Sequence, residues 1–389
     1  MTLKPFQVLN QLRAKRDDFA AFDKTALQAL QKYRSALAEA SQETAEDLLE
    51  QLSRFAMNDR GAEPLEPLSY PDWVIPAKLS WQSREESLEW VRDRLTGVAT
   101  FAVDGSQIYP SKDISLPVAL VQIGWYENLH LPNGQYEKDV MLDVMTPAEL
   151  RVSNSGDPVD RRVNMRRFEM ETQRLMQYMD DRAGDSNCLA FFDGSLVVTF
   201  AEAFDDATRR FYVHCIAELL KASEKTRVPL VAYIDTTYAR DLTGMLQRLY
   251  SLPEATSLHD APLLSRSMQW GDRTPLFRCR RPGILNHYPG TLGDRVAFSY
   301  LKAHEGFPVR LELPVWIYEA GLHEQVIDWV RCEVIIGSGY PYAIETADQT
   351  AVLKTEDRQI FLRLLQDWAE EEDLKLRLSR KMVSKVRRR

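Results

Sequence analysis

Apolar residues in the first 60 positions recur at mixed steps of three and four, which is the spacing of an amphipathic helix. The positions that carry this pattern are Leu9, Leu12, Phe19, Phe22, Leu27, Leu30, Tyr33 and Leu37. Residues 61–76 hold four prolines and little periodicity, so we expect a loop there. Residues 84–95 again have the pattern of a short amphipathic helix. We therefore expect a helical N-terminal region over residues 1–95.

From Val98 the pattern changes to short apolar runs, which are typical of strands. The first three runs lie at residues 98–110, 115–129 and 138–146, and their short connections favour antiparallel pairing. Further helices are expected at 159–181, 203–225 and 239–250, and further strands at 189–200, 228–235, 307–318 and 331–337. Residues 253–306 look mostly irregular, and two helices close the chain, from about Tyr342 and over 356–376. This order predicts an α/β fold with a mixed β-sheet flanked by helices.

Composition limits the class of protein. A chain of 389 residues that is 44% hydrophobic can bury a core without disulfides. Its four cysteines are far apart and form no CxxC pair, which favours buried free thiols in a reducing compartment. No apolar stretch is long enough to cross a bilayer and no signal peptide is evident, so we expect a cytoplasmic protein without a membrane partner.

Charge is distributed unevenly along the chain. The net charge of −8 argues weakly against a nucleic-acid partner, yet the last sixteen residues carry eight Lys or Arg and no acid. Two further basic clusters lie at residues 161–168 and 277–283. Candidate contacts to a phosphate backbone are Arg280, Arg281, Arg387 and Arg388. For the tail alone, a solvated terminus is the simpler explanation.

One tripeptide occurs twice. Asp104-Gly105-Ser106 and Asp193-Gly194-Ser195 each follow an apolar, strand-like run. Asp-Gly is first of all a hairpin signal, because Gly accepts a positive φ and Asp tolerates it. That explanation is weaker for the second copy, because an apolar run resumes directly and a helix follows.

Carboxylates held together at strand ends also bind hard divalent cations. Two such ions can activate a water and stabilise the leaving oxygen in phosphodiester cleavage. Such a site needs an Asp on the first strand, a Glu on the helix after the third strand and an Asp on the fourth. Asp104, either Glu169 or Glu171, and Asp193 fit in this order, which is the order of a ribonuclease-H-like sheet. Periodicity places both glutamates on nearly equivalent lines of the helix.

The sequence resembles the NurA nuclease family. The residues that carry the resemblance are those of the two Asp-Gly-Ser stretches, GDRTPLF at 271–277 and GYPYAIETAD at 339–348. It implies a nuclease domain over residues 96–372, followed by a basic tail at 373–389. It also implies that the two Asp and one helix Glu bind manganese. In the last motif, Tyr340 matches the family tyrosine, and Asp348 stands where the family has a histidine. Asp348 can still ligate Mn²⁺ or Mg²⁺, or it can mark a lost activity.

What the resemblance implies about function goes further than the residues. The resemblance implies a toroidal dimer that acts as a 5′-to-3′ exonuclease and single-strand endonuclease in DNA end resection. It also implies that the dimer acts together with the hexameric translocase HerA. We therefore expect a homodimer that binds DNA and HerA and holds two Mn²⁺ or Mg²⁺ ions per site. The alternatives are an actin- or sugar-kinase-like ATPase and a catalytically dead scaffold of the same fold.

Other motifs narrow the chemistry. The six histidines show no HxH or HExxH spacing, so a zinc site is not expected. No GxxxxGK[ST] motif is present, so ATP hydrolysis is assigned to the partner. Asp235, at the end of a predicted strand, is interpreted as a helix cap rather than a metal ligand.

Overall fold

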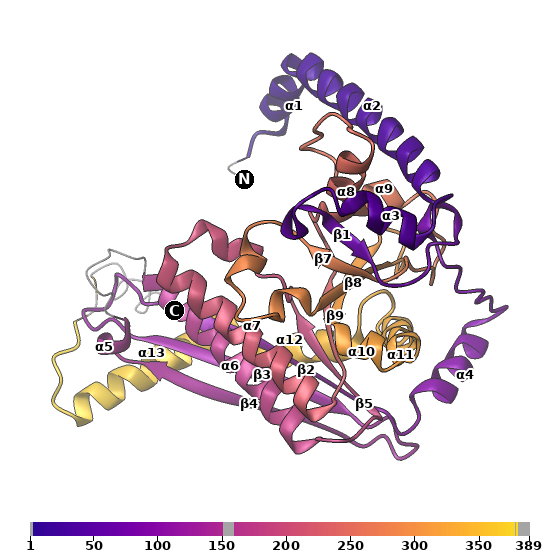
Figure 1. Ribbon diagram of the computed structural model, residues 1–389. Coiled ribbons are helices and arrows are strands. Elements are labelled where there is room, and N and C mark those ends of the chain that lie inside the picture. Colours follow the sequence, from indigo (N-terminus) through magenta and orange to yellow (C-terminus); the bar gives the residue numbers. More distant parts are fainter. Residues whose placement is uncertain (1–2, 151–158, 378, 380–389) are drawn as a thin grey trace. The chain divides into compact units, whose positions relative to one another are not determined.

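The computed structural model describes residues 3–150, 159–377 and 379 (Figure 1). The chain divides into two compact units, each assembled from separate stretches. The smaller unit comprises Met1–Leu79, Ile234–Asn286 and Val296–Leu311, and the larger unit comprises Ser80–Tyr233, His287–Arg295 and Glu312–Arg389. The sequence had suggested consecutive regions instead. The C-terminal half of the helix at 16–40 and the helix at 45–52 pack against helices within residues 241–264, whereas the helix at 5–14 buries no residue. The helix at 84–95 belongs to the larger unit.

The larger unit contains five strands in the order β6-β5-β2-β3-β4. They are β2 (Ala99–Ile108), β3 (Ala119–Asn128), β4 (Tyr136–Met145), β5 (Cys188–Asp193) and β6 (Leu230–Ile234). Strands β2, β3 and β4 pair antiparallel, as their short connections predict. Strand β5 runs parallel to both β2 and β6. This is the ribonuclease-H-like arrangement, so the expected mixed α/β fold is confirmed.

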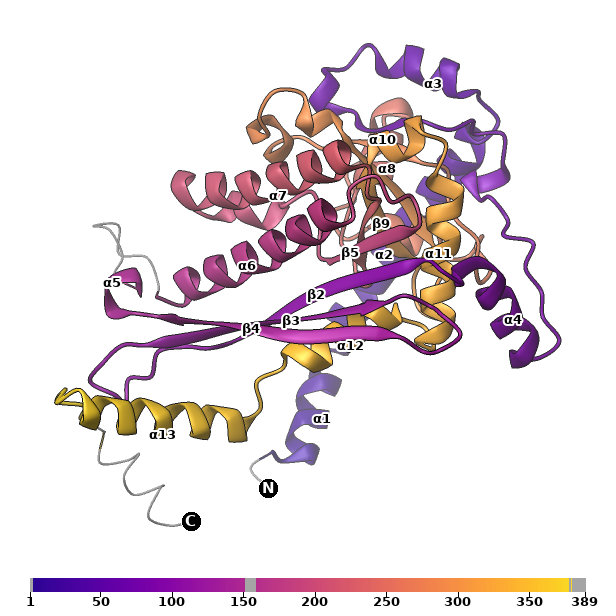
Figure 2. The same ribbon diagram turned by 90° about the horizontal axis from the view of Figure 1, so that it is seen from below.

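Helices cover both faces of this sheet. They are α4 (Arg84–Leu95), α5 (Pro147–Leu150), α6 (Val159–Asp181), α7 (Asp206–Thr226), α10 (Val315–Glu319), α11 (His323–Ile336), α12 (Tyr342–Ala351) and α13 (Thr355–Glu371). Figure 2 shows α6 and α7 on one face of β2–β4, with α12 and α13 on the other. The bounds of α4 and α6 are those that the apolar spacing predicts.

The smaller unit holds the N-terminal helices and the strand order β1-β7-β8-β9. Its strands are β1 (Gly61–Pro64), β7 (Phe277–Arg280), β8 (Val296–Leu301) and the start of β9 (Val309–Pro314), and its helices are α1 (Pro5–Ala14), α2 (Arg16–Ala40), α3 (Ala45–Leu52), α8 (Asp241–Leu249) and α9 (Asp260–Leu264). The C-terminal half of α2 buries Tyr33 and Leu37, and the Tyr33 hydroxyl donates to the Pro253 carbonyl (3.0 Å). Within the predicted helical region, residues 5–14, 16–40 and 45–52 are therefore α-helical, whereas residues 61–64 form a strand.

Several predicted elements are wrong. The predicted loop at 61–76 contains β1, and the predicted irregular stretch at 253–306 contains β7, β8 and α9. Strands β1 and β7 have only four residues each and carry charged or turn residues, which hides their pattern, whereas β8 is a short buried run of mostly apolar residues. The predicted strand at 307–318 ends at Pro314, after which α10 begins.

The predicted strand at 331–337 is the C-terminal part of α11. Its buried residues Val326, Val330 and Val334 are four apart, which is the spacing of a helix. The local run of β-branched residues suggested a strand because the window was too short to reveal this period. Similarly, the predicted strand at 189–200 stops at Asp193, and a 3₁₀ turn follows at Thr199–Ala203.

Candidate metal centre

Asp104 and Asp193 lie side by side on neighbouring parallel strands. Val103 of β2 pairs with Phe192 of β5, so the two aspartates follow at the next position of each strand. Asp104 is not in a hairpin, because β2 continues through it and pairs Asp104 with Gly124 of β3. At Gly194 the backbone φ is +153°, and the chain leaves the sheet. The hairpin explanation is therefore wrong for both copies of the tripeptide.

Gly105 makes room for a third carboxylate. A Cβ atom at this position would overlap Glu171 Oε1 and lie 2.6 Å from Arg167 Cγ, both on α6. Successive side chains of a strand point to opposite faces. Gly105 therefore faces α6, while Asp104 faces the opposite layer. The glycine allows the Glu171 carboxylate to rest against the strand beside Asp104.

The structure separates the two candidate glutamates. Glu171 is buried, with 8% of its surface exposed. Glu169 is half-buried and accepts from Arg166 Nη1 (2.8 Å), whose Nε also binds Asp143 (2.5 Å). Burial raises the pKa of Glu171, and the negative charges of both nearby aspartates raise it further. Glu171 is thus the glutamate that the fold brings to the aspartates.

Asp348 reaches the site from the other face of the sheet. Its helix, α12, packs closely on β3, where a Cβ at Gly124 would lie 2.6 Å from the Ala351 amide nitrogen. The Leu353 amide also donates to Ser106 Oγ (3.1 Å). In this position the Asp348 carboxylate lies near enough to Asp104 to raise its pKa, in addition to the larger effect of burial. The expected fourth carboxylate is therefore next to the first.

Tyr340 belongs to the same cluster. Its hydroxyl donates to Asp193 Oδ1 at 3.3 Å. Its ring packs edge-on against buried Tyr233 of β6, with centroids 5.2 Å apart. The tyrosine that the last motif singled out thus contacts one of the two strand aspartates directly.

Crowding of negative charge changes the acidity of these groups. Burial raises the pKa of Glu171 to about 8, with a smaller contribution from Asp104 and Asp193, while Arg167 lowers it. Burial also raises the pKa of Asp104 to about 6; the Gly105 amide, which donates to it, lowers the value, and Asp348 and Asp193 raise it. Two carboxyl groups therefore hold protons at pH values where ordinary carboxylates are ionised.

The donor set suits a hard cation. Glu171 Oε1 is buried and accepts no hydrogen bond, and Arg167 Nε lies 3.6 Å away. Carboxylate oxygens are the ligands that Mn²⁺ and Mg²⁺ prefer. Within the described part of the chain, no three of these carboxylates have oxygens that all lie within 4.8 Å of one another. Asp193 and Asp348 are exposed, so we expect their side chains to rotate toward a bound ion.

Sequence reasoning missed two residues around the cluster. Arg167 Nη1 donates to the Gly105 carbonyl (3.1 Å), which ties α6 to β2 beside Glu171. Glu312 is buried and accepts from Ser195 Oγ (2.8 Å) and the Leu196 amide (2.7 Å), which fixes the segment after Asp193. Arg167 lies in the basic cluster at 161–168, which could have indicated it. Glu312 has no signal in the sequence.

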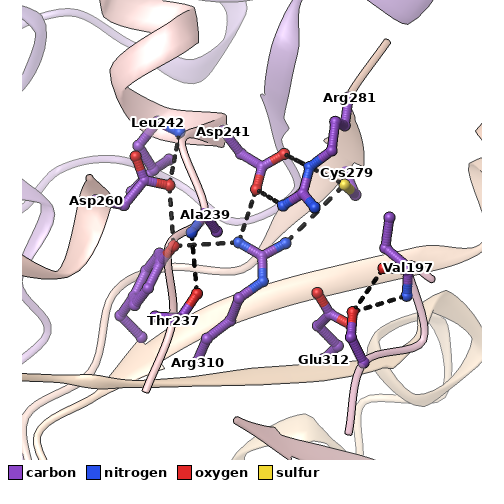
Figure 3. Close-up of polar contacts among 12 residues, drawn as sticks. Val197, Thr237, Ala239, Asp241, Leu242, Asp260, Cys279, Arg281, Arg310 and Glu312 are labelled. Atoms are coloured by element: carbon purple, nitrogen blue, oxygen red, sulfur yellow. Dashed lines mark hydrogen bonds and ion pairs between the residues drawn. The ribbon is translucent and has the colours of Figure 1, made fainter. Parts of the chain in front are cut away.

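Two of the four expected DNA contacts, Arg280 and Arg281, are held in ion pairs within the smaller unit. Arg280 is 4% exposed, and its Nε binds Glu63 Oε2 at 2.7 Å. Arg281 binds buried Asp241 (2.6 Å), which also holds Arg310 (2.9 Å), as Figure 3 shows. Arg280 and Arg281 therefore stabilise the smaller unit through internal ion pairs. We no longer expect these two arginines to contact phosphate. Arg387 and Arg388 lie outside the described residues.

The capping role expected for Asp235 is also wrong. Helix α8 begins at Asp241, and its N-terminus is capped by Asp260, whose carboxylate accepts from the Leu242 and Thr243 amides (3.0 and 2.8 Å). Asp235 Oδ1 instead lies 3.1 Å from His304 Nε2. Among the helices that the structure describes, none is both long enough and apolar enough to cross a membrane.

The strand order β6-β5-β2-β3-β4 is that of the ribonuclease-H-like class of folds, and the two aspartates lie on its neighbouring strands β2 and β5. Residues 98–353 match the family model described as NurA domain. Because this match covers more than half of the chain, the chain belongs to the NurA family of nucleases. Among solved structures, endonuclease V from Bacillus subtilis is similar at 11% identity over 74% of this chain and 98% of that chain. Its TM-score of 0.32 is too low to support an argument. No curated protein gives a significant match.

Proposed function

We propose that this protein is a metal-dependent deoxyribonuclease that hydrolyses phosphodiester bonds with two Mn²⁺ or Mg²⁺ ions. The observation that carries the proposal is the convergence of Asp104, Glu171 and Asp193 with Asp348, where burial, with smaller contributions from neighbouring carboxylates, raises the pKa of Asp104 and of Glu171. Such a perturbation is costly in the metal-free fold and is relieved when a cation binds.

The residues have separate parts in this mechanism. Asp104, Glu171, Asp193 and Asp348 hold the ions, which supply a nucleophile at neutral pH and stabilise the leaving oxygen. Tyr340 orients Asp193 through its hydroxyl. Arg167 holds Glu171 against β2 and balances its charge when no ion is bound. Neither serine of the two tripeptides is placed as a nucleophile, since Ser106 accepts from the Leu353 amide and Ser195 binds Glu312. No covalent enzyme intermediate is required.

The biological part of the proposal rests on family membership. We propose that the protein forms a homodimer and acts with a HerA-type hexameric translocase in DNA end resection for double-strand break repair. It would degrade DNA as a 5′-to-3′ exonuclease and cut single strands as an endonuclease. ATP hydrolysis would belong to the translocase, because this chain has no P-loop.

Mn²⁺ is expected to raise the melting temperature of the wild type, and more at pH 8 than at pH 6. Ligands that bind only the folded state stabilise it. Below pH 8 the ion must displace a proton from Glu171, whose pKa is about 8. Without metal, stability should fall as pH rises from 4.5 to about 8, by at most about 1.4 kcal/mol per pH unit, because only the folded state keeps this proton. Differential scanning fluorimetry measures both effects.

The same measurement separates the alternatives. Asp193→Asn should lose most of the Mn²⁺-dependent shift while melting normally in EDTA. ATP with Mg²⁺ should give no shift beyond that of Mg²⁺ alone. A melting temperature that Mn²⁺ does not change at either pH would indicate a scaffold without a metal site. A rise in melting temperature that only ATP causes would favour the kinase-like alternative.

A further inference from the structure

An exposed aromatic ring lies in the segment that follows Asp193. Phe200, in the 3₁₀ turn Thr199–Ala203, is 49% exposed, although large apolar side chains are usually buried. Its ring makes edge-on contacts with Tyr212, Phe204 and Phe168, with centroid distances of 5.0, 6.3 and 6.4 Å. We call Phe168, Phe200, Phe204 and Tyr212 the aromatic cluster. These contacts hold the Phe200 ring in place while leaving part of it open to solvent.

The aromatic cluster borders the metal centre. The Phe168 ring packs edge-on against Phe192, the residue before Asp193, at 5.9 Å. Phe168 also lies on α6 next to Arg167 and three residues before Glu171. Burial is the main cause of the raised pKa of Tyr212, about 12, and the charges of Arg167, Arg161 and Glu171 also affect it. Tyr212 therefore lies near the residues around Glu171. All of these residues belong to the larger unit.

Positive charge accompanies the cluster. The Arg161 guanidinium lies over the Phe204 ring, 4.7 Å from its centroid, and its Nη1 binds Asp205 at 3.0 Å on the surface. Such partly exposed pairs are weak and can exchange for a phosphate. Two more arginines in the first turns of α6 and α7, Arg162 and Arg210, have no carboxylate within 4.0 Å among the residues the structure describes. The basic cluster at 161–168 therefore lies beside exposed aromatic surface.

We propose that the aromatic cluster binds a single DNA strand next to the metal centre, with an unpaired base stacked on Phe200 and a neighbouring phosphate on Arg161. Aromatic rings beside arginines are the usual platform for single-stranded nucleic acid, because every base offers a π-face. A base in a duplex is already stacked and cannot reach the ring. The inference deepens the proposed nuclease function, since it gives the strand a path toward the carboxylates.

Binding of an end-labelled oligothymidylate of about 12 nucleotides, within the usual range for one single-strand site, tests the proposal. Fluorescence anisotropy in EDTA, with the full chain, measures the affinity. Phe200→Ala should weaken single-strand binding by roughly 5- to 150-fold, the usual effect of losing one stacked base. Phe200→Tyr, which keeps the ring, should retain it. Arg161→Gln should lower the salt dependence, log K against log salt, by about 0.7, the value of one phosphate contact on a single strand.

Controls separate stacking from a loss of structure. Trp368→Ala removes a ring that is 46% exposed on α13, the helix on the opposite face of the sheet, and should leave binding unchanged. Binding of a duplex should not respond to Phe200→Ala. Wild-type affinity of Phe200→Ala would overturn the proposal, as would a folded Phe200→Tyr that binds no better than Phe200→Ala.

The nuclease function can fail separately. Cleavage of DNA by the wild type with Mn²⁺ is measured in parallel. Binding that depends on Phe200 without any cleavage would keep the strand site and sink the proposed hydrolysis. Cleavage by the wild type, together with single-strand affinity that neither Phe200→Ala nor Arg161→Gln changes, would support the proposed hydrolysis and reject the strand site.

Discussion

Glu171→Gln is expected to lower Mn²⁺-dependent cleavage of DNA by about 10³-fold or more, whereas Glu169→Gln should cleave at nearly the wild-type rate. Ligated ions supply several kcal/mol of transition-state stabilisation, and each 1.36 kcal/mol corresponds to about a tenfold change in rate. Glu171 is the buried glutamate beside Asp104 and Asp193, and Glu169 is occupied by Arg166. The two substitutions are chemically identical and lie two residues apart, so each is the control for the other.

Stability distinguishes a lost ligand from a lost fold in this comparison. The folded state already favours a neutral group at position 171, because burial raises the pKa of Glu171. Glutamine is neutral and of similar shape, so Glu171→Gln should melt no lower than the wild type at pH 8 in EDTA. Equal cleavage by the two variants, or a greater loss for Glu169→Gln, would show that the ligand assignment is wrong.

Gly105→Ala should damage the site through a single methyl group. The new Cβ would overlap Glu171 Oε1 and crowd Arg167, so α6 or both side chains must shift. Overpacking of this kind costs about 1–3 kcal/mol of stability, and a displacement of about 1 Å at a catalytic group can cost roughly 10² in rate. We therefore expect a modest fall in melting temperature and a much larger fall in cleavage rate.

A second glycine supplies the control for this substitution. Gly244→Ala lies in α8 of the smaller unit, where the new Cβ would meet only the flexible end of Arg248 at 3.3 Å. Alanine is the better helix former, so this variant should melt at the same or a higher temperature and keep full cleavage. A Gly105→Ala protein that cleaves at the wild-type rate would mean that Glu171 need not approach the strand.

The chemistry of the site was predictable from sequence because it depends on local pattern. An apolar run followed by Asp places each aspartate on a strand, Asp193 at the end of β5 and Asp104 within β2. The strand–helix–strand order around them brings the two together. Periodicity could not choose between Glu169 and Glu171, since both lie near the sheet-facing side of α6. The choice depends on Gly105, whose missing side chain admits one carboxylate and not the other, and this contact joins residues 66 positions apart in the chain.

The errors share a different cause. Arg280 and Arg281 looked like surface charge because a sequence does not show that Glu63 and Asp241 neutralise them. Glu312 was invisible because its partners, Ser195 and Leu196, lie more than a hundred residues away. The short strands β1 and β7 have little apolar pattern of their own and are held by pairing with each other. In each case a long-range contact decides the outcome.

The most direct test of the metal centre is cleavage of end-labelled single- and double-stranded DNA by wild type, Asp104→Asn and Asp193→Asn, each with Mn²⁺, Mg²⁺ or EDTA and with or without the HerA-type translocase. The account predicts metal-dependent cleavage by the wild type, none in EDTA, and loss of cleavage in both variants while they remain folded. Cleavage that persists in EDTA, or in either folded variant, would contradict it. Silence of the wild type with every metal, even with the translocase present, would contradict it as well.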